Sequence, residues 1–133
     1  MLAPGKVVKK AVAFAGMKGN AADLTAEAML HNLKTAEHLG CLDKAGLHDM
    51  HQGQAPTIRR GPQAGDQLSV DHIIPWRVAP ELGNVIANLE LMPLRMNEGK
   101  NDRIGARQRS LAKKLYKAGL LSKGGLRAVL AWP

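Results

Sequence analysis

The chain has 133 residues, one cysteine and a formal net charge of +8 at pH 7. This length fits one domain of ordinary size, and a single cysteine, Cys41, excludes both an internal disulfide and a structural zinc site built on cysteines. Aromatic residues make up only 3% of the chain, which argues against a binding site built on stacked aromatic side chains.

The first 65 residues predict a helical extension followed by a loop. Residues 20–40 have the clearest helical pattern, because Asn20 can cap the start, apolar residues recur every three or four positions, and Gly40 suits the end. Residues 52–67 are rich in glycine and proline, which indicates a loop. We therefore expect a scaffold helix and then an irregular connection.

Two short strands are predicted next, at Leu68–Ile74 and Asn88–Met92, and a proline follows each of them. The residues between the two strands, 76–87, are polar and typical of turns. The predicted order is therefore strand, loop and strand.

Helical character is predicted from near Asn97 to about Ala118, with Gly119 as the terminator. Ser122 is expected to cap a last short helix that ends near Leu130. The predicted fold class is therefore α+β and mostly helical.

The positive charge is concentrated in one segment, residues 95–127, whose own net charge is +8, while the rest of the chain is neutral. Such a localised field favours a polyanionic partner through steering and counterion release. The alternative is a solvated helix face with no ligand. A helix that lies on a membrane surface would need large apolar residues opposite the charges, and this segment has few.

Three polar features stand close to the predicted strand ends. Asp71 and His72 end the first strand, Asn88 begins the second, and Asn97-Glu98-Gly99-Lys100 begins the long helix. Each has an ordinary structural explanation by itself, since Asn is common at caps and turns and a strand His is usually a hydrogen-bonded structural residue.

Together, the ordered segments Asp-His-Ile-Ile-Pro, Asn-Leu-Glu-Leu-Met and Asn-Glu-Gly-Lys-Asn-Asp resemble the core of HNH endonucleases over roughly residues 66–105. The resemblance is to the HNN variant, because Asn97 stands where many members have a final histidine. It implies a ββα-metal core at residues 66–119, a two-stranded antiparallel hairpin packed on a helix. The whole chain, 1–133, is then a single domain with residues 1–65 as an N-terminal helical extension and loop.

The resemblance also implies roles for individual residues. His72 would be the general base and Asn88 would hold the loop that follows it. Asp71 and Asn97 would bind one divalent metal ion, and two oxygen ligands favour Mg²⁺ or Mn²⁺ over Zn²⁺. The backbone amides at the expected helix start near Asn97 would favour an anion at the same place.

Four basic side chains are candidates for phosphate contacts in this interpretation of the site: Lys100, Arg95, Arg103 and Arg107.

One geometric condition applies to the metal site. Strict strand alternation sends Asp71 and His72 to opposite faces, so both can serve one site only if the strand ends or bulges there.

A rival metal site is offered by other histidines. His48 and His51 lie three positions apart with Asp49 between them, and His31 and His38 lie on the first predicted helix. The pair of His48 and His51 could bind a metal ion if that segment is helical, but a third clear ligand is missing.

The leading hypothesis is a metal-dependent endonuclease that nicks DNA, rather than RNA, with low sequence specificity, as a monomer or a homodimer. The alternatives are a nucleic-acid-binding ββα module without catalysis and a helical basic interaction protein. No run of 18 apolar residues predicts a membrane span. The localisation stays open between the cytoplasm and export, because the basic and apolar residues at 6–15 only faintly resemble a signal peptide.

Overall fold

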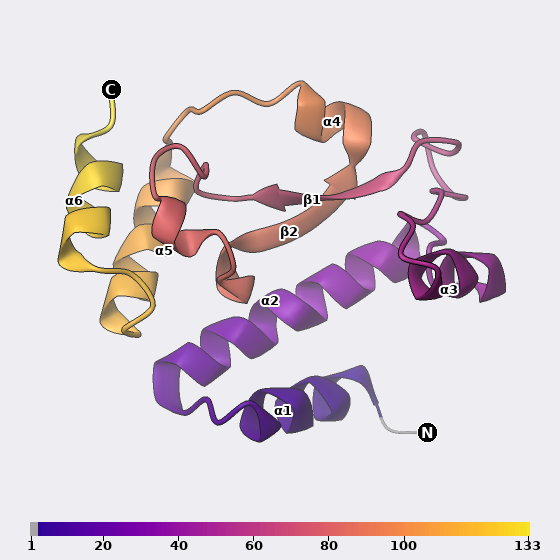
Figure 1. Ribbon diagram of the computed structural model, residues 1–133, viewed down its shortest axis with the longest axis horizontal. Helices are drawn as coiled ribbons and strands as arrows, with labels where there is room; N and C mark the ends of the chain where they lie inside the picture. Colours follow the sequence, from indigo (N-terminus) through magenta and orange to yellow (C-terminus); the bar gives the residue numbers. More distant parts are fainter. Residues whose placement is uncertain (1–2) are drawn as a thin grey trace. The chain divides into compact units, whose positions relative to one another are not determined.

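The computed structural model describes residues 3–133. Within them the fold is α+β and mostly helical, with six α-helices, two short 3₁₀ helices and one two-stranded antiparallel sheet (Figure 1). The fold class predicted from the sequence is confirmed at this level. The elements in chain order are α1 (Pro4–Phe14), α2 (Gly19–His38), α3 (Lys44–His51), β1 (Leu68–His72), η1 (Pro80–Leu82), η2 (Ile86–Asn88), β2 (Leu89–Pro93), α4 (Leu94–Glu98), α5 (Ala106–Lys117) and α6 (Lys123–Ala131).

The chain divides into two compact units, each made of separate stretches of sequence. Unit 1 comprises Met1–Leu30, His72–Leu89 and Asn101–Pro133. Unit 2 comprises His31–Asp71 and Glu90–Lys100. Each unit contains its own cluster of buried apolar residues.

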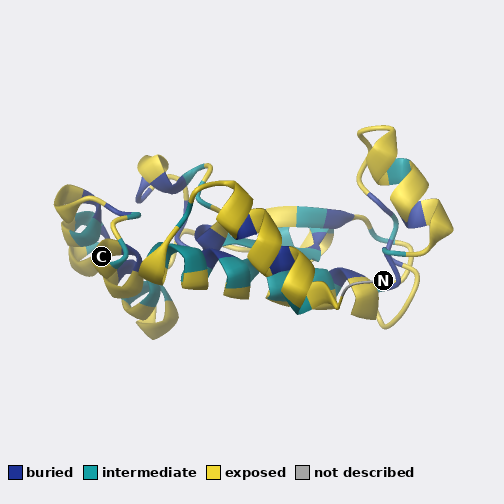
Figure 2. Cartoon of the chain, turned by 90° about the horizontal axis from the view of Figure 1, so that it is seen from below, coloured by how far each residue is buried: buried dark blue, intermediate teal, exposed yellow. Residues whose placement is uncertain are grey.

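The helix predicted at residues 20–40 is confirmed as α2, but it begins at Gly19, so Asn20 lies within the first turn and the prediction that it caps the helix was wrong. Its end follows from Gly40, whose φ of +73° is in the left-handed region that glycine adopts without strain. The amide of Cys41 then bonds to the carbonyl of Ala36 at 2.9 Å, which closes the last helical turn. The short helix α3 follows, capped by the Asp43 side chain and exposed over most of its surface (Figure 2).

The sheet of β1 and β2 matches the two predicted strands with shifted ends. β1 stops at His72 instead of Ile74, because the amides of Ile73 and Ile74 are both taken by Asn88 and no longer pair with a strand. Asn88 itself belongs to η2, so the prediction that it starts the second strand was wrong by one residue.

One backbone amide of β2 is bound from outside the sheet. The Asn32 side chain on α2 accepts a hydrogen bond from the Leu91 amide at 3.0 Å, within unit 2. The strand is thereby fixed to the helix as well as to β1.

The long helix predicted from Asn97 to Ala118 was wrong at its start. Asn97 lies in the last turn of the five-residue α4, and residues 99–105 form a non-helical connection before α5 begins at Ala106. Two glycines, Gly99 and Gly105, bracket this connection and weaken helix continuation. The predicted anion-binding helix start near Asn97 is therefore also wrong, since a helix end presents carbonyl groups.

The core of unit 1 places α5 and α6 side by side (Figure 1). Ala112 and Leu115 of α5 and Val129 of α6 are fully buried, with Ile74 and Leu82 from the segment after β1 in the same cluster. The predicted cap of α6 is confirmed, because the Ser122 hydroxyl accepts a hydrogen bond from the Gly125 amide at 3.0 Å.

Candidate active site

The candidate catalytic and metal-binding residues belong to different units. His72 and Asn88 are part of unit 1, whereas Asp71, Asn97 and Lys100 are part of unit 2. Asp71 and His72 are consecutive residues, and they are the last two of β1. The condition that the strand must end at this point is met by the end of β1.

The imidazole of His72 is held by one backbone carbonyl. Its Nε2 lies 3.1 Å from the oxygen of Gly83, and the side chain is half-buried. A carbonyl oxygen only accepts hydrogen bonds, so this contact assigns the proton to Nε2 and leaves the lone pair on Nδ1. Nδ1 is thus the atom of His72 that can take a proton.

Asn88 is fully buried and makes two hydrogen bonds to one residue of the segment after His72. Its Oδ1 accepts from the Ile74 amide at 2.8 Å, and its Nδ2 donates to the Ile74 carbonyl at 3.1 Å. Its backbone carbonyl also accepts from the Ile73 amide at 2.9 Å. Three hydrogen bonds therefore join Asn88 to the two residues that follow His72.

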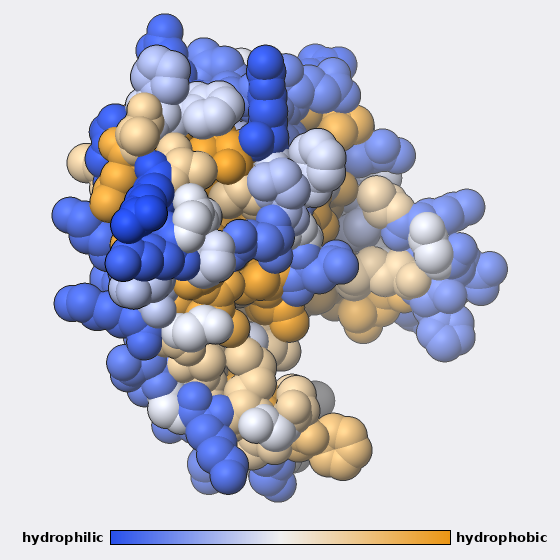
Figure 3. All heavy atoms as spheres, turned by 60° about the vertical axis from the view of Figure 1, so that its left-hand side comes forward, coloured by the Kyte–Doolittle hydropathy of each residue, from blue (hydrophilic) through white to orange (hydrophobic). Residues whose placement is uncertain are grey.

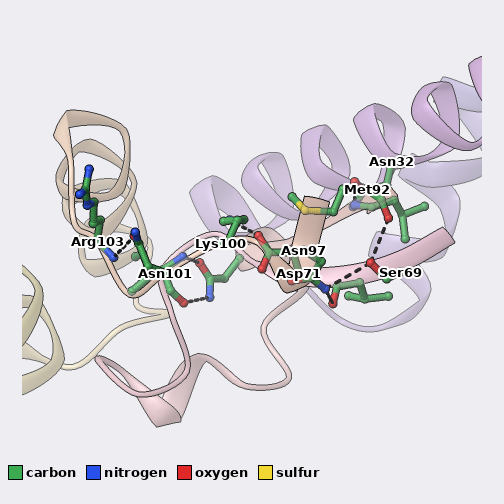
Figure 4. Close-up of polar contacts among 12 residues, drawn as sticks. Asn32, Ser69, Asp71, Met92, Asn97, Lys100, Asn101 and Arg103 are labelled. Atoms are coloured by element: carbon green, nitrogen blue, oxygen red, sulfur yellow. Dashed lines mark hydrogen bonds and ion pairs between the residues drawn. The ribbon is translucent and has the colours of Figure 1, made fainter. Parts of the chain in front are cut away.

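Asp71 is buried and forms an ion pair with Lys100 (Figure 4). The carboxylate is 10% exposed, whereas the Lys100 side chain is 36% exposed. The contact uses the Oδ2 atom of Asp71. The negative charge of this carboxylate is thus balanced by one ammonium group that solvent can still reach.

The amide of Asn97 is oriented by two acceptors on β1. Its Nδ2 donates to the Ser69 hydroxyl and to the Val70 carbonyl, both at 3.2 Å (Figure 4). The Ser69 hydroxyl in turn donates to the Met92 carbonyl at 3.0 Å. Because both N–H bonds of the amide are used, Oδ1 is the Asn97 atom left to serve as a ligand.

The donor set fits a hard cation. A carboxylate from Asp71 and an amide oxygen from Asn97 are the kinds of ligand that Mg²⁺ and Mn²⁺ accept, with further positions for water or phosphate oxygens. A cation already stands at the Asp71 carboxylate, namely the Lys100 ammonium. Within residues 3–133, no group of three or more His, Cys, Asp or Glu side chains is placed to hold a metal ion.

The other basic candidates differ in their surroundings. Arg95, Arg103 and Arg107 are all exposed. The backbone amide of Arg95 donates to the Asp66 carboxylate at 3.1 Å, which fixes the start of α4. Arg103 lies in the connection between α4 and α5, and Arg107 lies in the first turn of α5.

Two contributors to the candidate site were not predicted from the sequence. Ser69 orients Asn97, and strand alternation could have suggested it, because it lies two residues before Asp71 and so shares its face of β1. Gly83 binds His72 through a carbonyl, and no sequence signal identifies a backbone acceptor of this kind.

The rival histidine site has part of the expected geometry. His48 and His51 both lie on α3 and are exposed, so their helical spacing is confirmed. Among the described residues, neither belongs to a cluster of three potential ligands. His31 and His38 are exposed on α2.

No family model, curated protein or solved structure matched the chain. In the part of the chain that the structure describes, none of the helices combines the length and hydropathy that a membrane span needs.

Proposed function

We propose that the chain is a metal-dependent endonuclease of the HNH type that cleaves DNA, with residues 66–119 as its ββα-metal core. The observation that carries the proposal is the hydrogen bond between His72 Nε2 and the Gly83 carbonyl. It leaves the basic Nδ1 of an imidazole available next in sequence to a buried carboxylate. Metal-dependent hydrolysis of a phosphodiester uses a general base and a bound cation.

His72 acts as the general base in this proposal. Nδ1 takes a proton from a water molecule, whose oxygen attacks phosphorus as the bond from phosphorus to O3′ breaks. The departing O3′ takes a proton from solvent, so the products are a 5′-phosphate and a 3′-hydroxyl. An imidazole suits this role because one ring nitrogen can accept a proton while the other donates a hydrogen bond.

Asn88 acts as a positioning residue. Its paired hydrogen bonds to Ile74 fix the backbone directly after His72. A base must lie within about 3 Å of the proton that it removes. Asn88 fixes the backbone after His72, and the Gly83 carbonyl holds the ring through Nε2. Together these contacts restrict the imidazole to a small range of orientations.

Asp71 and Asn97 would hold one Mg²⁺ or Mn²⁺ ion. When bound, such an ion neutralises charge that develops on the phosphate and on the leaving oxygen. Lys100 would then be released from Asp71 and could bind a phosphate oxygen as a point charge. A single centre of this kind cuts one strand, so nicking is the expected activity.

The test is cleavage of supercoiled plasmid in Mg²⁺, Mn²⁺ or EDTA. We expect the wild-type protein to produce nicked plasmid with either metal and none in EDTA, and we expect His72→Ala to lose at least about two orders of magnitude in rate, as removal of a general base does. His48→Ala is the matched control, because it removes an exposed histidine of the rival site. Its rate should equal that of the wild type.

The results separate the proposal from its alternatives. If His48→Ala abolishes nicking and His72→Ala does not, the base has been assigned to the wrong histidine. If the wild type binds plasmid but cuts neither DNA nor RNA in any metal, the chain is the non-catalytic binding module instead. Cleavage of RNA alone would overturn the choice of substrate.

A further inference from the structure

The C-terminal part of the chain, residues 103–133, carries a net positive charge. Residues 103–133 contain eight Lys or Arg and no Asp or Glu. Glu81 of η1 approaches α6, but its carboxylate accepts hydrogen bonds from the Ser122 amide and hydroxyl, at 2.6 and 2.8 Å. It therefore binds the capping residue Ser122, and Lys113, Lys114 and Lys117 take part in none of the salt bridges of residues 3–133.

Three of the five cations of α5 lie on the side opposite its core contacts. Ala112 and Leu115 are fully buried, while Lys113, Lys114 and Lys117 are exposed. At 100° per residue the three lysines fall within one arc on the outer half of the helix. Hydrophilic side chains lie over much of the surface when the α5 and α6 side is turned toward the viewer (Figure 3).

This arrangement is unfavourable for an isolated helix. Lys113 and Lys117 are four residues apart, and Lys123 and Arg127 on α6 repeat the same spacing. Like charges at this spacing repel each other and destabilise a helix. A polyanion on the outer face would remove the repulsion.

We propose that the outer face of α5, formed by Lys113, Lys114 and Lys117, binds the phosphate backbone of duplex DNA independently of metal and of sequence. The inference rests on the proposed nuclease function. It adds a second contact surface, distinct from the four basic residues predicted from the motif. The surface would hold the duplex while individual phosphodiester bonds are cut.

The surroundings of the three lysines favour a duplex over other polyanions. Between the lysines this face carries the small residues Ala106 and Ser110, so no large apolar side chain can insert into a lipid surface. Stacking on single-stranded bases needs aromatic side chains, and the one aromatic residue of α5, Tyr116, lies on its flank. Backbone contacts with a duplex need only cations.

The test measures binding without cleavage. A labelled duplex of mixed sequence is titrated with the His72→Ala protein in EDTA at several salt concentrations between 50 and 200 mM. The variant pair is Lys113→Gln with Lys117→Gln. The matched control is Lys18→Gln with Lys44→Gln, which makes the same change of charge at two exposed lysines outside α5.

Each phosphate contact adds about 0.9 to the slope of log affinity against log salt. We therefore expect the α5 pair to lower the slope by about 2 and the control pair to leave it unchanged. The loss should be the same for duplexes of unrelated sequence. Equal slopes for the two variant pairs would overturn the inference. It would also be overturned if the protein that retains the α5 lysines bound anionic vesicles or single-stranded RNA more tightly than the duplex.

The nuclease proposal is tested separately in protein that retains His72. At low salt the α5 pair should nick plasmid with a raised KM and an unchanged kcat, because the reacting groups are intact. If the wild-type protein binds the duplex through α5 but never cuts it, the proposed nuclease function is wrong and the proposed DNA-binding face stands. If it cuts normally and its binding does not depend on the α5 lysines, the proposed DNA-binding face is wrong and the nuclease function stands.

Discussion

Lys100 forms an ion pair with Asp71, so the carboxylate proposed as a metal ligand already has a cation beside it. A divalent ion must compete with this ammonium group for the same oxygen. We expect Lys100→Met to bind Mn²⁺ several-fold more tightly than the wild type, as measured by electron paramagnetic resonance of free Mn²⁺. The same variant should cleave more slowly, because it lacks the cation proposed for the phosphate.

Lys100→Arg provides the control for this prediction, since it retains a cation that can pair with Asp71. Its Mn²⁺ affinity should stay near that of the wild type. Weaker Mn²⁺ binding by Lys100→Met would mean that Lys100 supports the metal site instead of competing with it.

Asn88→Ala should destabilise the protein strongly. The substitution leaves the amide and carbonyl of Ile74 without partners in a fully buried position. An unsatisfied buried polar group costs roughly 1–3 kcal/mol, so the loss of two should lower the free energy of unfolding by several kcal/mol. Urea denaturation measures it, with Asn84→Ala, an exposed residue of the same loop, as the control. Similar urea midpoints for the two variants would show that the hydrogen bonds of Asn88 to Ile74 do not stabilise the fold.

Ser122→Ala should cost about 1 kcal/mol of stability, the usual effect of removing a helix cap. The hydroxyl accepts from the Gly125 amide and donates to Glu81, so one substitution breaks two hydrogen bonds. Thermal unfolding of Ser122→Ala and Ser110→Ala would compare a capping serine with an exposed serine inside α5. A larger loss for Ser110→Ala would contradict the assignment of the cap.

Cys41 should make stability depend on pH in the alkaline range. Burial raises the pKa of the thiol, Asp43 raises it further and Arg59 lowers it in part. The folded state therefore holds the thiol proton more tightly than the unfolded chain, in which the thiol pKa is near its ordinary value of 9.0. This contribution is complete below that pH and is lost as pH rises toward the higher pKa of the folded state.

Urea denaturation at a series of pH values from 7 upward tests this prediction. Because lysines also titrate in this range, the comparison is with Cys41→Ala, which keeps every other group. The stability of the wild type should fall more steeply above about pH 9 than that of the variant. Parallel curves would show that the thiol does not contribute.

Most helices and strands could be located from the sequence, because residues close to their ends in the chain determine where they begin and end. Gly40 ended α2 and Ser122 began α6 through caps that involve only nearby backbone groups. Tertiary contacts decided the rest. β1 was shortened by Asn88, which lies sixteen positions after His72 in the chain, and such a contact leaves no periodic pattern.

The candidate site was predictable in its residue types but not in its contacts. The acid, imidazole and amide groups could be chosen from the motif, whereas their partners could not. Ser69 and Gly83 bind through a hydroxyl and a backbone carbonyl, groups that occur throughout any sequence. The position of Asn97 depends on where the five-residue helix α4 ends.

The hydrogen bond from the Leu91 amide to Asn32 has a consequence for self-association. A sheet of only two strands exposes unpaired amides and carbonyls, which are a template for adding a strand from another molecule. The Asn32 side chain occupies one of these amides in the middle of β2, so a third strand could not pair in register there. Replacing Asn32 would open this edge and favour aggregation through sheet extension.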